Sequence, residues 1–245
     1  MIKRESKKNT LSIIENSMSR LYRDYKIYSA VIDMREIYIR DKDELAFNQK
    51  KSLRFKDHYL SILSNKEIEY LVDLSNTKNK IQWIAGRYAV KSALFKYKLR
   101  EESLMDLSCI DIIKGADSAP YLLQYPDINI SISHSFPYCI AVLSEANLGI
   151  DLEKIFQLSG AVVDRFFTLG ERNVLVNIDD DYQYSKKAIM YWTRKEAVSK
   201  FFRLGMKMPF KKVDTSKKEI IYDNVEIKLI SFDCSDFFMS IAIEK

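Results

Sequence analysis

Three acidic residues and one lysine have the types and spacing to do chemistry. Asp151 and Glu153 stand two residues apart in a segment whose strict alternation predicts a strand with both carboxylates on one face. Glu196 and Lys200 stand four residues apart in a long predicted helix, so they share one face of that helix. If the strand and the helix meet, they form an acidic site with an ammonium group beside it.

An acidic site of this kind suits a divalent cation and a phosphorylated substrate. Neighbouring carboxylates repel one another unless a cation lies among them. Mg²⁺ prefers oxygen ligands and usually takes one or two carboxylates, with water and substrate phosphates completing its shell. The Lys200 ammonium would offset the remaining charge of a diphosphate. Each motif alone has an ordinary alternative, because Asp-X-Glu strands are common and Glu–Lys pairs at this spacing usually lie on solvated helix faces.

The elements that must position these groups alternate between strands and helices, which predicts an α+β fold. Two long helices are expected at 81–99 and 185–204, and a shorter one at 161–167. Another helix is expected to begin at Ser64, because Glu67 follows three residues later as in a capping box. Strands are predicted at 26–34, 128–133, 138–143, 148–153, 220–222, 225–231 and 237–243.

The two long predicted helices contain similar short sequences, which indicates an internal duplication. Arg87 begins a basic-X-Ala-Val sequence in the first helix and Lys195 begins one in the second, each downstream of a tryptophan. We therefore expect two similar halves packed face to face. The predicted division is a flexible lead-in at 1–20, an N-terminal half at 21–147 and a C-terminal half at 148–245.

Composition excludes several classes of protein. Hydrophobic residues make up 47% of the 245 residues, enough for a packed core. The net charge of +5 and the lack of a recognised motif argue against a nucleic-acid-binding protein. No apolar run is long enough to span a membrane, and the N-terminus lacks the apolar stretch of a secretory signal. The 3 widely spaced cysteines indicate reduced thiols and predict a cytoplasmic protein.

The order of the motifs is more specific than any one of them. The chain has Ile-Ser-Ile-Ser-His-Ser at 130–135, Gly-Ile-Asp-Leu-Glu at 149–153, Arg-Phe-Phe-Thr at 165–168 and Trp-Thr-Arg-Lys-Glu-Ala at 192–197. In this order the sequence resembles the 4′-phosphopantetheinyl transferases of the Sfp type. The segment 86–94 is similar to the first-half helix of that family, and the resemblance runs from about residue 26 to 212.

The resemblance implies a pseudo-twofold fold of two similar α/β halves with coenzyme A in the cleft between them. The implied reaction transfers 4′-phosphopantetheine from coenzyme A to a serine of an apo acyl- or peptidyl-carrier protein and releases adenosine 3′,5′-bisphosphate. It would depend on Mg²⁺, with Mn²⁺ as a second suitable ion, and the protein would act as a monomer. The alternative is a non-catalytic homologue that binds coenzyme A or a carrier protein.

The resemblance also implies three sets of site residues. The metal ligands would be Asp151, Glu153 and Glu196. The cofactor-binding set would be Arg87 near the adenine, Lys91, Ser133, His134, Lys195 and Lys200. The catalytic set would be His134, Glu171, Glu196 and Lys200, in which Glu171 and Glu196 are alternatives for the general base.

Two positions depart from the pattern of the family. Many relatives have Gly-Lys-Pro before the Ser-His-Ser strand, whereas this chain has Ser118-Ala119-Pro120 and lacks the lysine. Phe136 stands where a small residue usually follows Ser-His-Ser. Both changes would alter the coenzyme A pocket. Neither removes a predicted metal ligand or Lys200, so the sequence favours an active enzyme.

Overall fold

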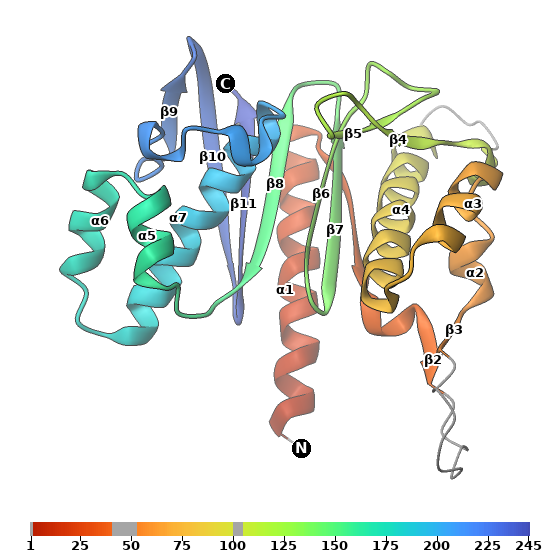
Figure 1. The fold of residues 1–245 in the computed structure, drawn as a ribbon, viewed down its shortest axis with the longest axis horizontal. Helices are drawn as coiled ribbons and strands as arrows, with labels where there is room; N and C mark the ends of the chain where they lie inside the picture. Colours follow the sequence, from red (N-terminus) through yellow and green to blue (C-terminus); the bar gives the residue numbers. More distant parts are fainter. Residues whose placement is uncertain (1, 41–52, 100–104) are drawn as a thin grey trace.

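The computed structural model describes residues 2–40, 53–99 and 105–245, and its fold is α+β, as the sequence predicts. Two antiparallel sheets lie side by side, each with a long helix packed on it, and a further helix runs between them (Figure 1).

The N-terminal sheet has the strand order β1-β7-β6. Strand β1 (Tyr28–Asp33) pairs with β7 (Tyr138–Ser144), which pairs in turn with β6 (Asn129–Ser135). Helix α4 (Thr77–Lys98) packs across all three strands. The apolar run predicted at 138–143 is the central strand, and every residue in that run is buried.

The C-terminal sheet has the strand order β8-β11-β10-β9. Its strands are β8 (Leu148–Lys154), β9 (Glu219–Tyr222), β10 (Val225–Cys234) and β11 (Phe237–Glu244). Helix α7 (Asp181–Phe201) packs on β8, β11 and β10. The predicted strands at 148–153 and in the tail are therefore confirmed, as is the second long helix.

The two halves share one topology. In each half a first strand leads through a long helix to a pair of strands, and the last strand inserts next to the first, giving β1-β7-β6 and β8-β11-β10. This arrangement confirms the expectation of two similar halves. The division between the sheets falls between Ser144 and Leu148, where β7 ends and β8 begins.

A buried ion pair repeats in both halves and fixes how they correspond. Helices α3 (Asn65–Asp73) and α6 (Leu169–Val176) each begin with a capping box. The glutamate of the box is the third helical residue, Glu67 in α3 and Glu171 in α6. Lys91 Nζ lies 2.6 Å from Glu67 Oε2, and Lys195 Nζ lies 2.8 Å from Glu171 Oε2. Lys91 therefore corresponds to Lys195. The similarity of the two basic-X-Ala-Val sequences instead pairs Arg87 with Lys195.

The first residues of the chain form a helix rather than the expected flexible lead-in. Helix α1 spans Ile2–Tyr25, and its Ile14, Met18 and Leu21 are buried among residues of β7, β8 and β11. These three side chains recur every three to four residues, so they lie on one helix face. The helix covers strands from both sheets and so ties the halves together (Figure 1).

The remaining elements are short, and most of them lack a clear sequence signal. Their bounds are α2 (Asp57–Leu60), α5 (Gly160–Phe166), β2 (Tyr38–Arg40), β3 (Leu53–Phe55), β4 (Ile112–Lys114) and β5 (Pro120–Leu122). Among the described helices, none is both long and apolar enough to cross a bilayer. All three cysteines are free; Cys139 and Cys234 are buried and Cys109 is exposed.

Candidate functional site

The two sheets meet where β6 runs beside β8, and serine side chains bridge the two strands. The hydroxyl of Ser131 accepts the Ile150 N–H at 3.0 Å, and that of Ser133 accepts the Leu152 N–H at 3.1 Å. The hydroxyl of Ser135 accepts the Lys154 N–H at 3.0 Å. We call Ser131, Ser133 and Ser135 the serine ladder; it satisfies backbone donors at the edge of β8 that face the other half.

Two carboxylates of β8 are held by the same serines. Ser133 Oγ donates to Asp151 Oδ1 at 2.8 Å, and Ser135 Oγ donates to Glu153 Oε2 at 3.2 Å. Asp151 is only 4% exposed. The site is therefore built on the seam between the halves, with hydroxyls from one half and carboxylates from the other.

Helix α7 can approach this seam because Gly149 has no side chain. A Cβ on Gly149 would lie 2.0 Å from the carbonyl oxygen of Ala197, so any larger residue would force the helix away from β8. Lys200 Nζ donates to Ile150 O at 2.9 Å and to Asp151 Oδ1 at 2.8 Å. Glu196 lies one turn earlier on the same helix.

The carboxyl groups at the seam influence one another strongly. Burial, and then the charge of Asp151, raise the pKa of Glu153 to about 7. The same two causes raise the pKa of Glu196 to about 7. Asp151 Oδ2 is buried and has no hydrogen-bond partner. The acidic groups repel one another, and one carboxylate oxygen has no hydrogen-bond partner. A cation bound here would relieve the repulsion and give that oxygen a partner.

The residue types fit a hard cation, but they are not gathered into a finished ligand cluster. Within the described residues, no set of three or more His, Cys, Asp or Glu side chains lies close enough together to hold a metal. The predicted ligands Asp151, Glu153 and Glu196 supply three oxygen-bearing side chains, and Asp151 offers its unpartnered oxygen. A cation would bind at the unpartnered Oδ2 of Asp151 after rotation of the Glu153 and Glu196 side chains toward it.

His134 projects from β6 near the same groups. Its side chain is exposed, yet the surrounding protein weakens the hydration of an imidazolium and so lowers its pKa from 6.5. The Lys200 charge lowers this pKa further, whereas Asp151 acts in the opposite direction. Ser133 is buried, and its hydroxyl is occupied by β8 rather than directed to solvent.

A cavity of about 260 Å³ opens beside the seam, between the two halves. Lys200 and Arg203 line it on one side, and the segment 118–120 lines it on the other. Arg203 donates to Asn129 Oδ1 at 2.8 Å and so bridges the halves at the cavity edge. The departure from the family pattern at Ala119 therefore falls on the wall of this cavity.

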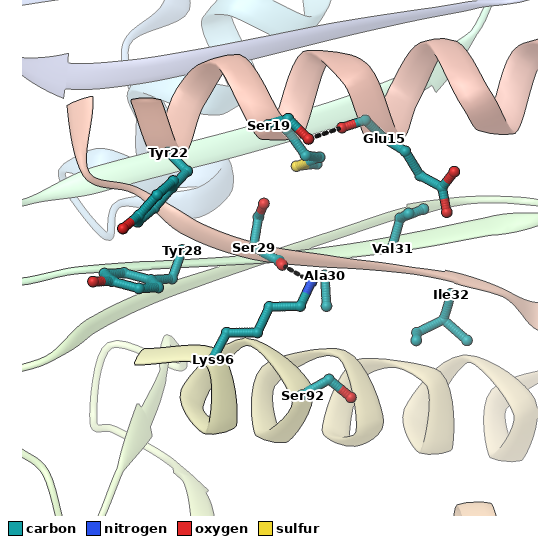
Figure 2. A pocket seen from close by; sticks show the side chains of 11 residues that line it. Glu15, Ser19, Tyr22, Tyr28, Ser29, Ala30, Val31, Ile32, Ser92 and Lys96 are labelled. Carbon is teal, nitrogen blue, oxygen red and sulfur yellow. Dashed lines mark hydrogen bonds between the residues drawn. The ribbon is translucent and has the colours of Figure 1, made fainter. Parts of the chain in front are cut away.

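A larger cavity of about 630 Å³ lies at the equivalent place in the N-terminal half, between α1, β1 and α4 (Figure 2). Lys96 corresponds to Lys200, and its Nζ donates to Ser29 O at 2.8 Å, as Lys200 does to Ile150 O. The positions equivalent to the three acidic residues are Ala30, Ile32 and Ser92. The counterpart thus keeps the lysine but has no carboxylate at these three equivalent positions; its acidic lining residue, Glu15, comes from α1.

Three predicted site residues lie in the interior instead. Lys91, Lys195 and Glu171 are each 0% exposed. Glu171 Oε1 accepts from the Thr215 N–H at 2.8 Å, while Lys195 donates to main-chain carbonyls. These contacts occupy the charged groups and favour a structural role for all three residues; cofactor binding by Lys91 and Lys195 and catalysis by Glu171 stay predictions.

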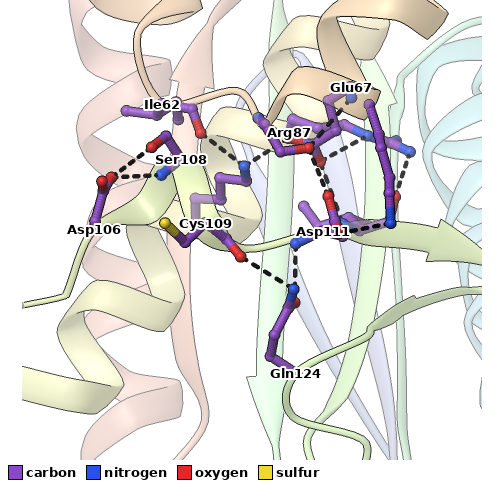
Figure 3. A network of polar contacts seen from close by, with 12 residues as sticks. Ile62, Glu67, Arg87, Asp106, Ser108, Cys109, Asp111 and Gln124 are labelled. Atoms are coloured by element: carbon purple, nitrogen blue, oxygen red, sulfur yellow. Dashed lines mark hydrogen bonds and ion pairs between the residues drawn. The ribbon is translucent and has the colours of Figure 1, made fainter.

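Arg87 also lies apart from the seam. Its guanidinium donates to Ile112 O at 3.2 Å, lies 3.8 Å from Glu67 Oε1 and covers the Trp83 ring. Figure 3 shows Arg87 among the polar contacts of Glu67 and Asp111. It lines a separate cavity of about 240 Å³ that none of the β6 or β8 residues reaches.

Sequence reasoning missed the serine ladder, although a signal for it is present. Serines recur at every second position from Ser131 to Ser135, so they share one face of a strand. The opposite face of the strand carries Ile130 and Ile132, yet Ser131 and Ser133 are also buried, at 4% and 5% exposure. A run of small hydroxyl residues on one buried face indicates contact with another backbone.

Comparisons with known proteins match the part of the chain that holds the carboxylates. Residues 147–238 match the model of a family described as the 4′-phosphopantetheinyl transferase superfamily. The chain is 25% identical over 124 residues to 4′-phosphopantetheinyl transferase psf-1 of Bacillus pumilus, covering 50% of this chain and 52% of that protein. It is 24% identical over 153 residues to 4′-phosphopantetheinyl transferase Sfp of Bacillus subtilis strain 168, covering 62% and 66%.

A shorter relative and two solved structures also match. The holo-[acyl-carrier-protein] synthase of Acholeplasma laidlawii is 29% identical over 92 residues, covering 36% of this chain and 75% of that protein. The Bacillus anthracis holo-(acyl-carrier-protein) synthase structure, in complex with CoA (3′,5′-ADP), has a TM-score of 0.35 at 21% identity, covering 48% and 91%. The Thermotoga maritima synthase structure has a TM-score of 0.31 at 11% identity, covering 41% and 63%.

The matches to the first two relatives extend over about half to two thirds of their length. The family match starts just before β8 and extends into β11, so it includes β8 and α7, from which Asp151, Glu153, Glu196 and Lys200 project. The comparisons therefore confirm the family resemblance of the sequence, and they place it in the segment 147–238, which matches the model of the 4′-phosphopantetheinyl transferase superfamily.

Proposed function

We propose that this protein transfers 4′-phosphopantetheine from coenzyme A to a serine of an apo acyl- or peptidyl-carrier protein. The names of the relatives support the class of reaction. The observation that carries the proposal is the meeting of Asp151, Glu153 and Glu196 with Lys200 beside a cavity between the halves. Negatively charged phosphates need such a combination of cation site and ammonium group for alignment and charge neutralisation.

The metal in this proposal is Mg²⁺, with Mn²⁺ as the alternative ion. Asp151, Glu153 and Glu196 would hold it, and when bound it would neutralise charge on the diphosphate of coenzyme A. Lys200 is 28% exposed at its side chain and lies 2.8 Å from Asp151, so it would contact a diphosphate oxygen. His134 would contact a second phosphate from the adjacent strand.

The transfer also needs an acceptor for the proton of the carrier serine. The serine oxygen forms a bond to the β-phosphorus, the bond from phosphorus to the bridging oxygen of adenosine 3′,5′-bisphosphate breaks, and the serine proton must leave. Of Glu171 and Glu196, only Glu196 lies at the seam, because Glu171 is fully buried against Lys195. We therefore assign the general base to Glu196, acting directly or through a water molecule.

One observation favours a second function, binding of coenzyme A or a carrier protein without catalysis. The carboxyl groups are not gathered into a ligand cluster, and Lys200 neutralises Asp151 directly. A homologue that binds coenzyme A or a carrier protein without catalysis would have the same fold and could keep this internal ion pair. Such a protein would bind coenzyme A without modifying any carrier.

The test is intact-mass measurement of apo acyl- and peptidyl-carrier proteins after incubation with this protein, coenzyme A and Mg²⁺. The proposal expects a mass gain of one phosphopantetheine group on at least one carrier, and loss of the gain when EDTA removes the metal. Binding of coenzyme A without a mass gain on any carrier favours the non-catalytic homologue. Transfer that is unaffected by EDTA would contradict the metal assignment.

A further inference from the structure

Each of two serines in the ladder makes a double contact with β8. Ser133 Oγ accepts the Leu152 N–H and donates to the carboxylate of Asp151, the preceding residue. Ser135 Oγ repeats this with the Lys154 N–H and the carboxylate of Glu153. A hydroxyl has one donor and two acceptor lone pairs, so it can make both bonds at once.

The third serine of the ladder makes only half of this contact. Ser131 Oγ accepts the Ile150 N–H at 3.0 Å, the same bond that the other two serines make to backbone. The preceding residue is Gly149, which has no carboxylate to hold. The ladder therefore separates two roles: all three serines join the strands, and only Ser133 and Ser135 also hold an acidic side chain.

The hydrogen bond from Ser133 determines which oxygen of Asp151 is free. Oδ1 accepts from both Ser133 and Lys200, whereas Oδ2 is buried and has no partner. Rotation of the Asp151 side chain would break the Ser133 bond and bury a second unsatisfied group, which is costly. The serine thus fixes the carboxylate with one oxygen available for a cation.

We propose that Ser133 and Ser135 are positioning residues, which hold Asp151 and Glu153 in place for a divalent cation, and that Ser131 only joins the strands. This inference rests on the proposed function for its metal. It adds that the N-terminal half positions ligands that belong to the C-terminal half. The cation site is then complete only when β6 and β8 are docked against each other.

The test measures Mg²⁺ binding by calorimetry, without coenzyme A or carrier protein, for Ser131→Ala, Ser133→Ala, Ser135→Ala and Ser133→Thr. Each alanine variant loses the hydrogen bond to the β8 backbone, and Ser133→Ala and Ser135→Ala also lose the bond to a carboxylate, so we expect Ser131→Ala to lower the urea midpoint of unfolding least. Partners that orient metal ligands typically contribute about 10–100-fold in affinity. We therefore expect Mg²⁺ binding to be about tenfold weaker in Ser133→Ala and Ser135→Ala. Ser131→Ala should keep the wild-type Mg²⁺ affinity, and Ser133→Thr, which retains the hydroxyl, should recover it.

Several outcomes would overturn the proposal. Equal weakening by Ser131→Ala would mean that the effect is only structural, and wild-type affinity in both Ser133→Ala and Ser135→Ala would remove the positioning role. Failure of the wild-type protein to bind Mg²⁺ would also end it. If Ser133→Ala does not fold, Ser135→Ala, at the less buried end of the ladder, decides the question.

The positioning role and the proposed function fail in different ways. If the predicted pattern of Mg²⁺ affinities is found but no carrier protein is modified, the positioning role stands and the transferase function falls. If carrier proteins are modified but the Mg²⁺ affinities do not follow the pattern, the transferase function stands and the positioning role falls.

Discussion

At the scale of single residues, Asp151 is the most constrained group of the site. One of its oxygens accepts from a serine of one half and a lysine of the other, and the second oxygen has no hydrogen-bond partner. Its charge also raises the pKa of both Glu153 and Glu196. Any change at this position should therefore act on the whole acidic cluster and not on one contact alone.

The role of Lys200 can be tested against Lys96, the lysine at the equivalent position of the N-terminal half. We expect Lys200→Met to lower kcat/KM for coenzyme A by tenfold or more, because a hydrogen bond to a charged group contributes about 1.5–3 kcal/mol. Lys96→Met removes the equivalent lysine, which binds the Ser29 carbonyl in a cavity with Ala30, Ile32 and Ser92 at the positions of the three acidic residues, and should leave transfer unchanged. Steady-state kinetics of both variants checks this, and equal losses would contradict the role of Lys200.

The cysteines should differ sharply in reactivity. Burial raises the pKa of Cys139 and of Cys234 to about 12, whereas Cys109 is exposed. Because the thiolate is the reactive form, iodoacetamide in mildly alkaline buffer should label Cys109 alone in the folded protein. Peptide mass spectrometry measures this, with denatured protein as the control in which all three react. Rapid labelling of Cys139 in folded protein would show that β7 is not buried as described.

At the scale of elements, the close approach of α7 to β8 determines where the helix residues lie. We expect Gly149→Ala to lower the free energy of unfolding by about 2 kcal/mol or more, because the new methyl group would overlap the Ala197 carbonyl. Gly160→Ala is the matched control, since nothing lies within 4 Å of its Cβ position in the first turn of α5. Urea unfolding of both variants checks this; equal stabilities would contradict the packing.

Sequence periodicity predicted the long elements well and the short ones poorly. The strands β6 and β8 alternate between apolar and polar or small residues, β7 is a continuous apolar run, and α4 and α7 are long helices in the segments where the sequence predicts them. The hairpins β2–β3 and β4–β5 have only three residues per strand, too few to show a period. Helix α6 is short, and its capping glutamate Glu171 was instead interpreted as a catalytic group.

The sequence could not predict which charged side chains have a buried partner far away in the chain. Lys91 and Lys195 have the spacing of surface lysines, but their partners Glu67 and Glu171 lie 24 residues away in each case. Only the packing of one helix on another reveals such a pair. By contrast, Asp151, Glu153, Glu196 and Lys200 come from two strongly periodic elements, and the structure brings them to one seam.

At the scale of the whole molecule, a buried Glu–Lys pair is repeated in the interior of both halves. We expect Glu171→Gln to lower the free energy of unfolding by about 3–5 kcal/mol, because it leaves Lys195 buried without a counter-ion. Glu67→Gln should act similarly through Lys91. Denaturant unfolding measures the loss, and Mg²⁺ affinity of the folded protein should not change. A stable but inactive Glu171→Gln variant would restore a catalytic role to Glu171.

One chain supplies both walls of the seam, since β6 belongs to the first half and β8 to the second. A second copy is not needed to complete the acidic cluster, so we expect the active protein to be a monomer. Light scattering on the column-purified enzyme, with transfer assayed in the same fraction, tests this. Activity confined to a dimer fraction would show that another copy contributes to the site.

The most direct test compares the wild-type protein with Asp151→Ala in transfer of phosphopantetheine to an apo carrier protein, followed by intact mass. With coenzyme A and Mg²⁺ present, we expect complete modification by the wild-type protein and none by the variant, while circular dichroism shows the same fold for both. Modification of the carrier by Asp151→Ala at the wild-type rate would contradict the placement of the cation and the diphosphate at this seam.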